Sequence, residues 1–257
     1  MKKICVIIPI YKEKLSEEEA YAVDRSVEVL KNRKLYFVAP AGMNSTWYES
    51  KYPQVKWETF ATKYFKNIFM YSRLLLSEHF YSRFSEYEYM LVVQPDVWIL
   101  SEDDKLDYFM QFAYDYIGAP WKQEEKLYPV IFKGMNHLEK VAKKWGIPFN
   151  QPLMARVGNG GMSLRKISAM LDIIKNHPVA VKISKISKRN NEDGFLCYYL
   201  NAKDKYRLPT SEFAEQFAAE QTARQLLEEG KIPFSVHAYE KRVGDHNIMR
   251  EYMEHRE

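Results

Sequence analysis

The sequence predicts a single α/β domain in which a mainly parallel central sheet is flanked by helices. Short apolar runs typical of buried strands alternate with stretches of helical periodicity, which is the pattern of βαβ units. The clearest strand, residues 90–93, runs directly into Gln94-Pro95-Asp96. Pro95 cannot donate to a central ladder, so strand pairing should stop there. Asp96 is therefore expected at the carboxyl end of a central strand, where open α/β sheets bind ligands.

Length and composition limit the functional classes. A chain of 257 residues with 46% hydrophobic content has ample material for one large core. The formal charge of +4 permits anionic partners such as nucleotide phosphates. No block of basic residues is concentrated on one face, so a nucleic-acid partner is not expected. No apolar stretch approaches the length needed to span a bilayer.

The first apolar run and the cysteines indicate the compartment. Residues 4–8 imitate a signal peptide, but Pro9 and Tyr11 end the run early and no small-residue cleavage site follows. We interpret this run as the first strand. Cys5 and Cys197 sit in apolar surroundings and are too few for a disulfide framework, which favours free thiols in a reducing cytoplasm. Cytoplasmic location is expected, and peripheral association with the inner face of the membrane stays open.

The elements of the first hundred residues follow from local signals. Ser16 with Glu19 three residues later has the spacing of a capping box and predicts a helix start. Further strands are expected at 35–39 and 55–60, and a long helix is expected over 62–84.

The second half of the chain begins with a predicted helix after residues 101–104. Acidic residues suit a first helical turn, so Asp103 and Asp104 are interpreted as caps rather than metal ligands. Residues 116–121 predict a short strand or edge, and the weaker pattern over 122–149 predicts an insertion over a site. The remaining expected elements are a helix over 167–174, an apolar helix over 195–200 and a strand over 233–239.

Two residues are candidate metal ligands. Asp96 could supply an oxygen to Mg²⁺ or Mn²⁺, which would in turn hold a diphosphate, or it could cap a local turn. His237, in the last expected strand, could be a ligand or a core residue. With one histidine and one aspartate on offer and no H-E-x-x-H or cysteine pair, a zinc site is not expected.

A glycine-rich turn, Gly158-Asn159-Gly160-Gly161, is the second candidate. Three glycines in four residues permit positive φ and close backbone approach, and a helix directly behind them would offer free amides to an anion. The alternative is a tight structural turn. The turn is not a Rossmann fingerprint, because that motif must follow the first strand.

Glu192 and Asp193 open the apolar helix expected over 195–200. A carboxylate there could act as a general base aimed into a pocket. It could equally be an acidic cap that stabilises the helix N-terminus.

Together, and in this order along the chain, these features resemble the GT-A-type glycosyltransferases. The closer resemblance is to a little-characterised bacterial branch found among polysaccharide-synthesis genes. The residues that carry it are Gln94-Pro95-Asp96, Ile117-Gly118-Ala119-Pro120-Trp121, residues 158–165, Glu192-Asp193, Ala214 through Phe217 to Glu220, and Pro233-Phe234-Ser235-Val236-His237.

The resemblance implies a GT-A-like, Rossmann-like single domain over residues 1–257. Roughly residues 1–100 would form the nucleotide-binding half, 101–240 the acceptor half and 241–257 a C-terminal tail. The implied reaction moves a hexose from a nucleotide sugar, with a uridine diphosphate sugar as donor, to a glycan or lipid-linked acceptor with inversion at the anomeric carbon.

The resemblance also implies roles for individual residues. Pro9 and Tyr11 would cradle the base and ribose of the donor. Asp96 would stand at the family's D-x-D position and bind Mn²⁺ or Mg²⁺ on the donor diphosphate, with His237 as the late ligand. Asp193, from the Glu-Asp pair, would deprotonate the acceptor hydroxyl. The glycine turn would shape the acceptor side.

Gln94 departs from the family pattern, because many members carry an acid at this position. One charge is missing, so a lower metal affinity is expected. The departure makes a non-catalytic glycan- or nucleotide-sugar-binding module on the same fold an alternative. A nucleotidyltransferase is a second alternative, but the segment after the first strand lacks the glycines that such an enzyme would show.

Four further side chains are weaker candidates. Trp98 and Trp121 could pack against a sugar ring, or both could lie in the core. Arg73 and Lys12 could contact donor phosphates, or both could be solvated surface charges.

Overall fold

The computed structural model describes residues 2–121, 158–185, 191–202 and 205–243 of the chain. Within these residues, six strands form a central sheet in the order β3-β2-β1-β4-β7-β6. Strands β1 (Lys2–Pro9), β2 (Lys34–Pro40), β3 (Lys56–Phe60) and β4 (Tyr87–Val93) run parallel to one another. The expected mainly parallel sheet is therefore confirmed.

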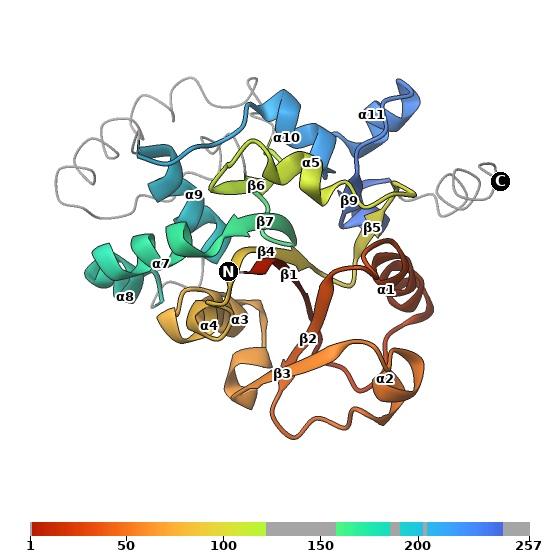
Figure 1. Ribbon diagram of the computed structural model, residues 1–257, viewed down its shortest axis with the longest axis horizontal. Helices are drawn as coiled ribbons and strands as arrows, with labels where there is room; N and C mark the ends of the chain where they lie inside the picture. Colours follow the sequence, from red (N-terminus) through yellow and green to blue (C-terminus); the bar gives the residue numbers. More distant parts are fainter. Residues whose placement is uncertain (1, 122–157, 186–190, 203–204, 244–257) are drawn as a thin grey trace.

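The far edge of the sheet changes direction. Strand β7 (Met162–Lys166) pairs antiparallel with β4, and β6 (Tyr116–Gly118) pairs antiparallel with β7. A second sheet of three short strands has the order β5-β9-β8, with β5 at Val97–Ile99, β8 at Ala218–Ala219 and β9 at Ser235–His237. This small sheet begins four residues after β4 ends, so it lies next to the carboxyl ends of the parallel strands (Figure 1).

Helices cover both sides of the central sheet. Helices α3 (Ile68–Leu75), α4 (Glu78–Ser82) and α7 (Ile167–Asn176) gather on one side, and α1 (Glu17–Val29) and α2 (Thr46–Lys51) lie on the other (Figure 1). The other described helices are α5 (Leu106–Met110), α8 (Pro178–Ser184), α9 (Glu192–Ala202), α10 (Ser211–Phe217), α11 (Ala223–Glu228), α12 (Tyr239–Arg242) and the 3₁₀ helix η1 (Thr62–Phe65). None of the helices in the described part of the chain is long and apolar enough to cross a membrane.

Several local expectations are confirmed. Ser16 and Glu19 form both hydrogen bonds of a capping box at the start of α1. Strands β1 and β4 are buried along almost their whole length, as their apolar runs predict. Cys5 is a buried free thiol, and burial raises its pKa above the usual range. Lys105 occupies the N-cap position of α5, and Asp104, one residue before it, accepts the backbone N–H of Leu106.

The long helix expected over residues 62–84 is wrong, because caps interrupt it twice. The side chain of Asn67 accepts the N–H of Met70 and starts α3, and the side chain of Ser77 accepts the N–H of Phe80 and starts α4. Each cap satisfies a backbone donor that a continuous helix would have paired internally.

The helix expected directly behind the glycine turn is also wrong. Residues 162–166 form β7, which is hydrogen-bonded to β4 on one side and β6 on the other, and α7 begins only at Ile167. No helix N-terminus therefore faces the turn from this segment. The insertion expected over residues 122–149 lies outside the described residues.

A buried polar network fixes β7 against the helices. The fully buried guanidinium of Arg165 donates to the hydroxyl of Tyr81 in α4 (3.1 Å), to the carbonyl of Gly160 (3.2 Å) and to Glu192 Oε1 at the start of α9 (3.1 Å). The other carboxylate oxygen of Glu192 accepts the hydroxyl of Ser72 in α3 at 2.8 Å. One arginine thus joins β7, the glycine turn, α4 and α9.

We expect Arg165→Met to lower the free energy of unfolding by about 3–5 kcal/mol, because it leaves the buried carboxylate of Glu192 without its cation. The double variant Arg165→Met/Glu192→Leu should recover part of that loss, since it removes both buried charges. Urea unfolding measures both values. As a control, Lys175→Met removes a cation from an exposed pair with Glu78 and should cost far less. Equal losses for Arg165→Met and Lys175→Met would contradict the anchoring role.

Candidate functional site

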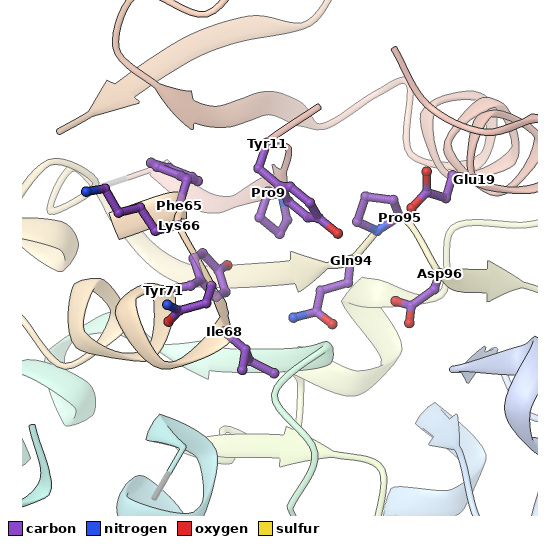
Figure 2. Close-up of a pocket in the computed structure, with 11 residues that line it drawn as sticks. Pro9, Tyr11, Glu19, Phe65, Lys66, Ile68, Tyr71, Gln94, Pro95 and Asp96 are labelled. Carbon is purple, nitrogen blue, oxygen red and sulfur yellow. The ribbon is translucent and has the colours of Figure 1, made fainter. Parts of the chain in front are cut away.

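A cavity of about 330 Å³ lies at the carboxyl ends of β1 and β4 (Figure 2). One wall comes from the strand ends and the loops after them: Pro9, Tyr11, Gln94, Pro95 and Asp96. The opposite wall comes from residues 65–68, between η1 and α3, and from Tyr71, while Glu19 of α1 closes one end. Four of the residues expected at a donor site, Pro9, Tyr11, Gln94 and Asp96, thus line one cavity.

Lys12 lies beside this cavity rather than in its wall. Its ammonium group donates to both carboxylate oxygens of the wall residue Glu19, at 2.6 and 2.9 Å. This bond raises the pKa of Lys12. Glu19 and residues 65–68 were not anticipated as wall residues, since a capping box and helix residues give no signal of a ligand.

Asp96, at one edge of the cavity, lies close to His237, which does not itself line the cavity. The short strands β5 and β9 pair so that Val97 lies opposite His237, which brings the histidine next to Asp96. His237 Nε2 lies 3.6 Å from Asp96 Oδ1 and 3.2 Å from Gln94 Oε1. Two candidate metal ligands predicted from distant parts of the sequence are therefore close neighbours.

The glycine turn passes directly behind this edge. The N–H of Gln94 donates to the carbonyl of Gly161 at 2.8 Å, and a Cβ at Gly161 would collide with the imidazole of His237. A Cβ at Gly160 would lie 2.7 Å from Glu192 Oε1. Glycine is thus required here for close approach. The positive φ that such a turn permits is recorded, among the described glycines, for Gly42 and Gly230.

The turn is buried, so it serves the site as a packing element. Asn159 is 9% exposed, and its amide donates to Glu220 Oε2 and accepts the N–H of Gly161, both at 2.7 Å. A Cβ at Gly158 would collide with the half-buried indole of Trp121. Gly158 to Gly161 and Trp121 thus have contacts within the protein, and their contact with a substrate stays a prediction.

Asp193 stands on the other side of the turn, in the first helical turn of α9. Its carboxylate accepts the N–H of Gly160 at 3.1 Å and the N–H of Gly194 at 2.7 Å. Burial and then the neighbouring carboxylate of Glu192 raise the pKa of Asp193 to about 7, although the two backbone bonds oppose this shift. A carboxyl group that ionises near neutral pH is suited to general-base chemistry.

Glu192 is not available for that chemistry. It is 6% exposed, and its two carboxylate oxygens are bound by Arg165 and Ser72. The expectation of a catalytic Glu192 is corrected to a structural one: it anchors α9 and raises the pKa of its neighbour.

Two further expectations fail for geometric reasons. Trp98 is 4% exposed and packs between Tyr21 and Tyr239, with ring centroids 4.9 and 5.2 Å away, so it cannot cover a sugar ring.

Arg73 donates to the carbonyl of Lys185 at 2.6 Å and lies over the ring of Phe69. Its guanidinium is therefore held by the protein and lines no part of the cavity.

The edge formed by Asp96, His237 and Gln94 fits a divalent ion that takes other ligands as well. The part of the chain that the structure describes holds no group of three or more His, Cys, Asp or Glu side chains able to bind a metal. Mg²⁺ sites in nucleotide-using proteins normally supply only one or two carboxylates, with phosphates and water completing the shell. Neighbouring ligands of such an ion lie about 3 Å apart. The observed separations of 3.2 and 3.6 Å are compatible with that arrangement.

Solved structures share the fold of the chain. Mouse xyloside xylosyltransferase 1, in its apo form, aligns with a TM-score of 0.55 and 11% identity over 93% of this chain and 99% of its own. This likeness confirms the GT-A-like fold. A glycosyltransferase involved in glycosylation of the major capsid of PBCV-1 aligns with a TM-score of 0.47 and 13% identity over 98% of both chains.

Core-mannan synthase A from Aspergillus fumigatus, in its Mn/GDP form, aligns with a TM-score of 0.46 and 11% identity over 77% of this chain. The alignment spans 66% of the length of that protein. No curated protein matches the sequence. A family described as "Protein of unknown function (DUF5672)" matches residues 54–237, which is well over half of the chain. The chain therefore belongs to the DUF5672 family.

Proposed function

We propose that this protein is a glycosyltransferase that moves a hexose from a nucleotide sugar to a glycan or lipid-linked acceptor. The observation that carries the proposal is the cavity at the carboxyl ends of β1 and β4, with Asp96 at its edge and His237 Nε2 3.6 Å from Asp96 Oδ1. The fold shared with a xylosyltransferase supports the reaction class. A uridine diphosphate sugar is the proposed donor, and polysaccharide synthesis in the cytoplasm is the proposed setting.

At the donor end, the base and ribose would lie against Pro9 and Tyr11, with the diphosphate directed toward Asp96. Mn²⁺ or Mg²⁺ held by Asp96 and His237 would stabilise the charge that develops on the leaving diphosphate. The amide oxygen of Gln94 is a neutral third donor, 3.2 Å from His237 Nε2. A site with one carboxylate binds a free ion weakly, so we propose that the ion enters with the nucleotide.

At the acceptor end, Asp193 is the proposed base. The acceptor oxygen forms a bond to the anomeric carbon as the bond from that carbon to the diphosphate oxygen breaks, and the hydroxyl proton passes to Asp193. This displacement inverts the anomeric centre. The raised pKa of about 7 supports the role, because such a carboxylate is basic enough to take the proton and is still about half ionised at neutral pH.

A non-catalytic nucleotide-sugar-binding module is the second candidate, and Gln94 is the observation that favours it. Replacing the first acid of the metal motif by an amide weakens the electrophilic assistance that the transfer needs. Such a module would bind the donor but release no nucleotide diphosphate from it.

We expect uridine diphosphate and Mn²⁺ together to raise the melting temperature by about 5–10 °C at a hundredfold excess over the dissociation constant. Asp96→Ala should remove the part of the shift that depends on Mn²⁺. Asp103→Ala is the matched control, because Asp103 is exposed and does not line the cavity. A shift in the wild type that persists in full with a chelator would exclude the metal role. No shift with any nucleotide or nucleotide sugar would exclude the donor site.

We expect Asp193→Asn to lower turnover by about 10²–10⁴-fold while nucleotide binding stays unchanged, because the amide cannot accept the proton. Release of the nucleotide diphosphate from a radiolabelled donor measures turnover. Only the ionised carboxylate acts as a base, so the wild-type rate should rise with pH below about 7 and level off above it. Full turnover in Asp193→Asn would reject the base assignment, and absence of turnover in the wild type with intact donor binding would favour the binding module.

A further inference from the structure

An ion pair between Lys12 and Glu19 lies at one end of the cavity, and the proposed reaction leaves it without a role. Glu19 lines the cavity, and its two carboxylate oxygens accept from the ammonium group of Lys12 at 2.6 and 2.9 Å. Figure 2 shows Glu19 and Asp96 toward the same end of the cavity. The bond to Glu19 raises the pKa of Lys12, and the charge of Asp96 adds to this rise, so the ammonium group lies within electrostatic reach of Asp96.

Both members of the pair are held in place by the fold. Tyr48, a fully buried residue of α2, donates its hydroxyl to the backbone carbonyl of Lys12 at 2.8 Å and so fixes the loop after β1. The backbone N–H of Ser16 donates to Glu19 Oε2 at 3.0 Å within the capping box of α1. Burial opposes the ionisation of Glu19, but the bonds from Lys12 and Ser16 outweigh it and hold its pKa below the usual value. Both groups are therefore charged at neutral pH, and the pair as a whole is neutral.

The pair leaves Asp96 as the uncompensated charge at this end of the cavity. Within the described part of the chain, the ion-pair partner of Asp96 is His237, which is charged only when protonated. Lys66, a cation in the cavity wall, extends its ammonium group away from Asp96 (Figure 2). A diphosphate that enters alone would therefore meet a net negative charge, whereas one that carries a divalent ion would not.

We propose that Glu19 is a specificity-determining residue that neutralises Lys12 and so restricts the cavity to nucleotide diphosphates that carry a divalent ion. The inference deepens the proposed function and rests on it for the identity of the ligand. Without the charge of Glu19, the ammonium group of Lys12 would be free to bind a phosphate oxygen, and hydrogen bonds between charged groups are the strong ones. One carboxylate outside the proposed metal site would thus decide whether binding requires the metal.

The test measures the binding of uridine diphosphate by calorimetry, in Mn²⁺ and in a chelator, for the wild type and for Glu19→Gln. Glutamine also forms a capping box at this position, so the variant removes the charge and keeps the start of α1. In chelator, Glu19→Gln should bind uridine diphosphate about 10–100-fold more tightly than the wild type, because Lys12 becomes available. In Mn²⁺ the affinity should change less, because the ion already compensates the phosphate charge.

Two further variants separate this mechanism from a general effect of charge. The double variant Glu19→Gln/Lys12→Met should bind uridine diphosphate in chelator about as weakly as the wild type, because the freed ammonium group is gone. Asp24→Asn is the matched control. It removes a carboxylate from the same helix, where Asp24 is exposed, accepts from Lys51 at 2.8 Å and does not line the cavity. This variant should leave both affinities unchanged.

An unchanged affinity in chelator for folded Glu19→Gln would overturn the inference, as would tight binding that persists in the double variant. Wild-type protein that binds uridine diphosphate equally well with and without Mn²⁺ would also overturn it, while leaving the donor site in place. No binding by the wild type in either condition would reject the proposed donor site and the inference together.

Discussion

The buried guanidinium of Arg165 is the interaction on which the geometry of the candidate site depends. A fully buried cation is stable only where hydrogen-bonding partners surround it, so the elements that supply those partners are fixed relative to one another. Here the partners are Tyr81, the carbonyl of Gly160 and Glu192. Because Glu192 begins α9, the same contact sets the position of Asp193, the next residue. The guanidinium of Arg165 in β7 thus fixes the position of the acidic N-terminus of α9.

Through the glycine turn, this placement also reaches the cavity at the carboxyl ends of β1 and β4. Gly160 gives its N–H to Asp193, and the next residue, Gly161, gives its carbonyl to the N–H of Gln94 at the end of β4. Two consecutive residues therefore contact the proposed base and the donor edge. Side chains at these positions would push apart the groups that the turn holds together. The absence of Cβ atoms is what brings β4, β9 and α9 to one place.

Local patterns were sufficient to predict the elements that depend on near neighbours. The apolar runs of β1 and β4, the capping box of α1 and the position of Asp96 after β4 all follow from residues close in sequence. Asn67 and Ser77 are residue types that commonly cap helices, and both lie within the periodic stretch 62–84 that the structure divides. Cap residues inside a periodic stretch are thus a local signal that it contains more than one helix.

Other features depend on partners far away in the chain. Strand β7 contains the buried Arg165. An arginine is normally expected at the surface, and this one is buried because Tyr81 and Glu192 accept its hydrogen bonds. The structural role of Glu192 depends on the same pairing. Glu220 lies within a segment that carries the family resemblance, but its relation to His237 arises only when β8 and β9 pair. Tertiary contacts, rather than local propensity, determine the environments of Arg165, Glu192 and Glu220.

In the proposed donor site, Gln94 would link metal affinity to the donor. With Asp96 as the one carboxylate ligand and His237 as an uncharged one, the protein would supply a single negative charge to a divalent ion, so the diphosphate would have to supply the rest. A second carboxylate at position 94 would lie beside Asp96 and attract the free ion, but it would also repel the diphosphate that arrives with it. The neutral amide avoids that repulsion and still offers an oxygen. In that site, Gln94 would lower the affinity for the ion alone more than the affinity for the ion bound to a nucleotide.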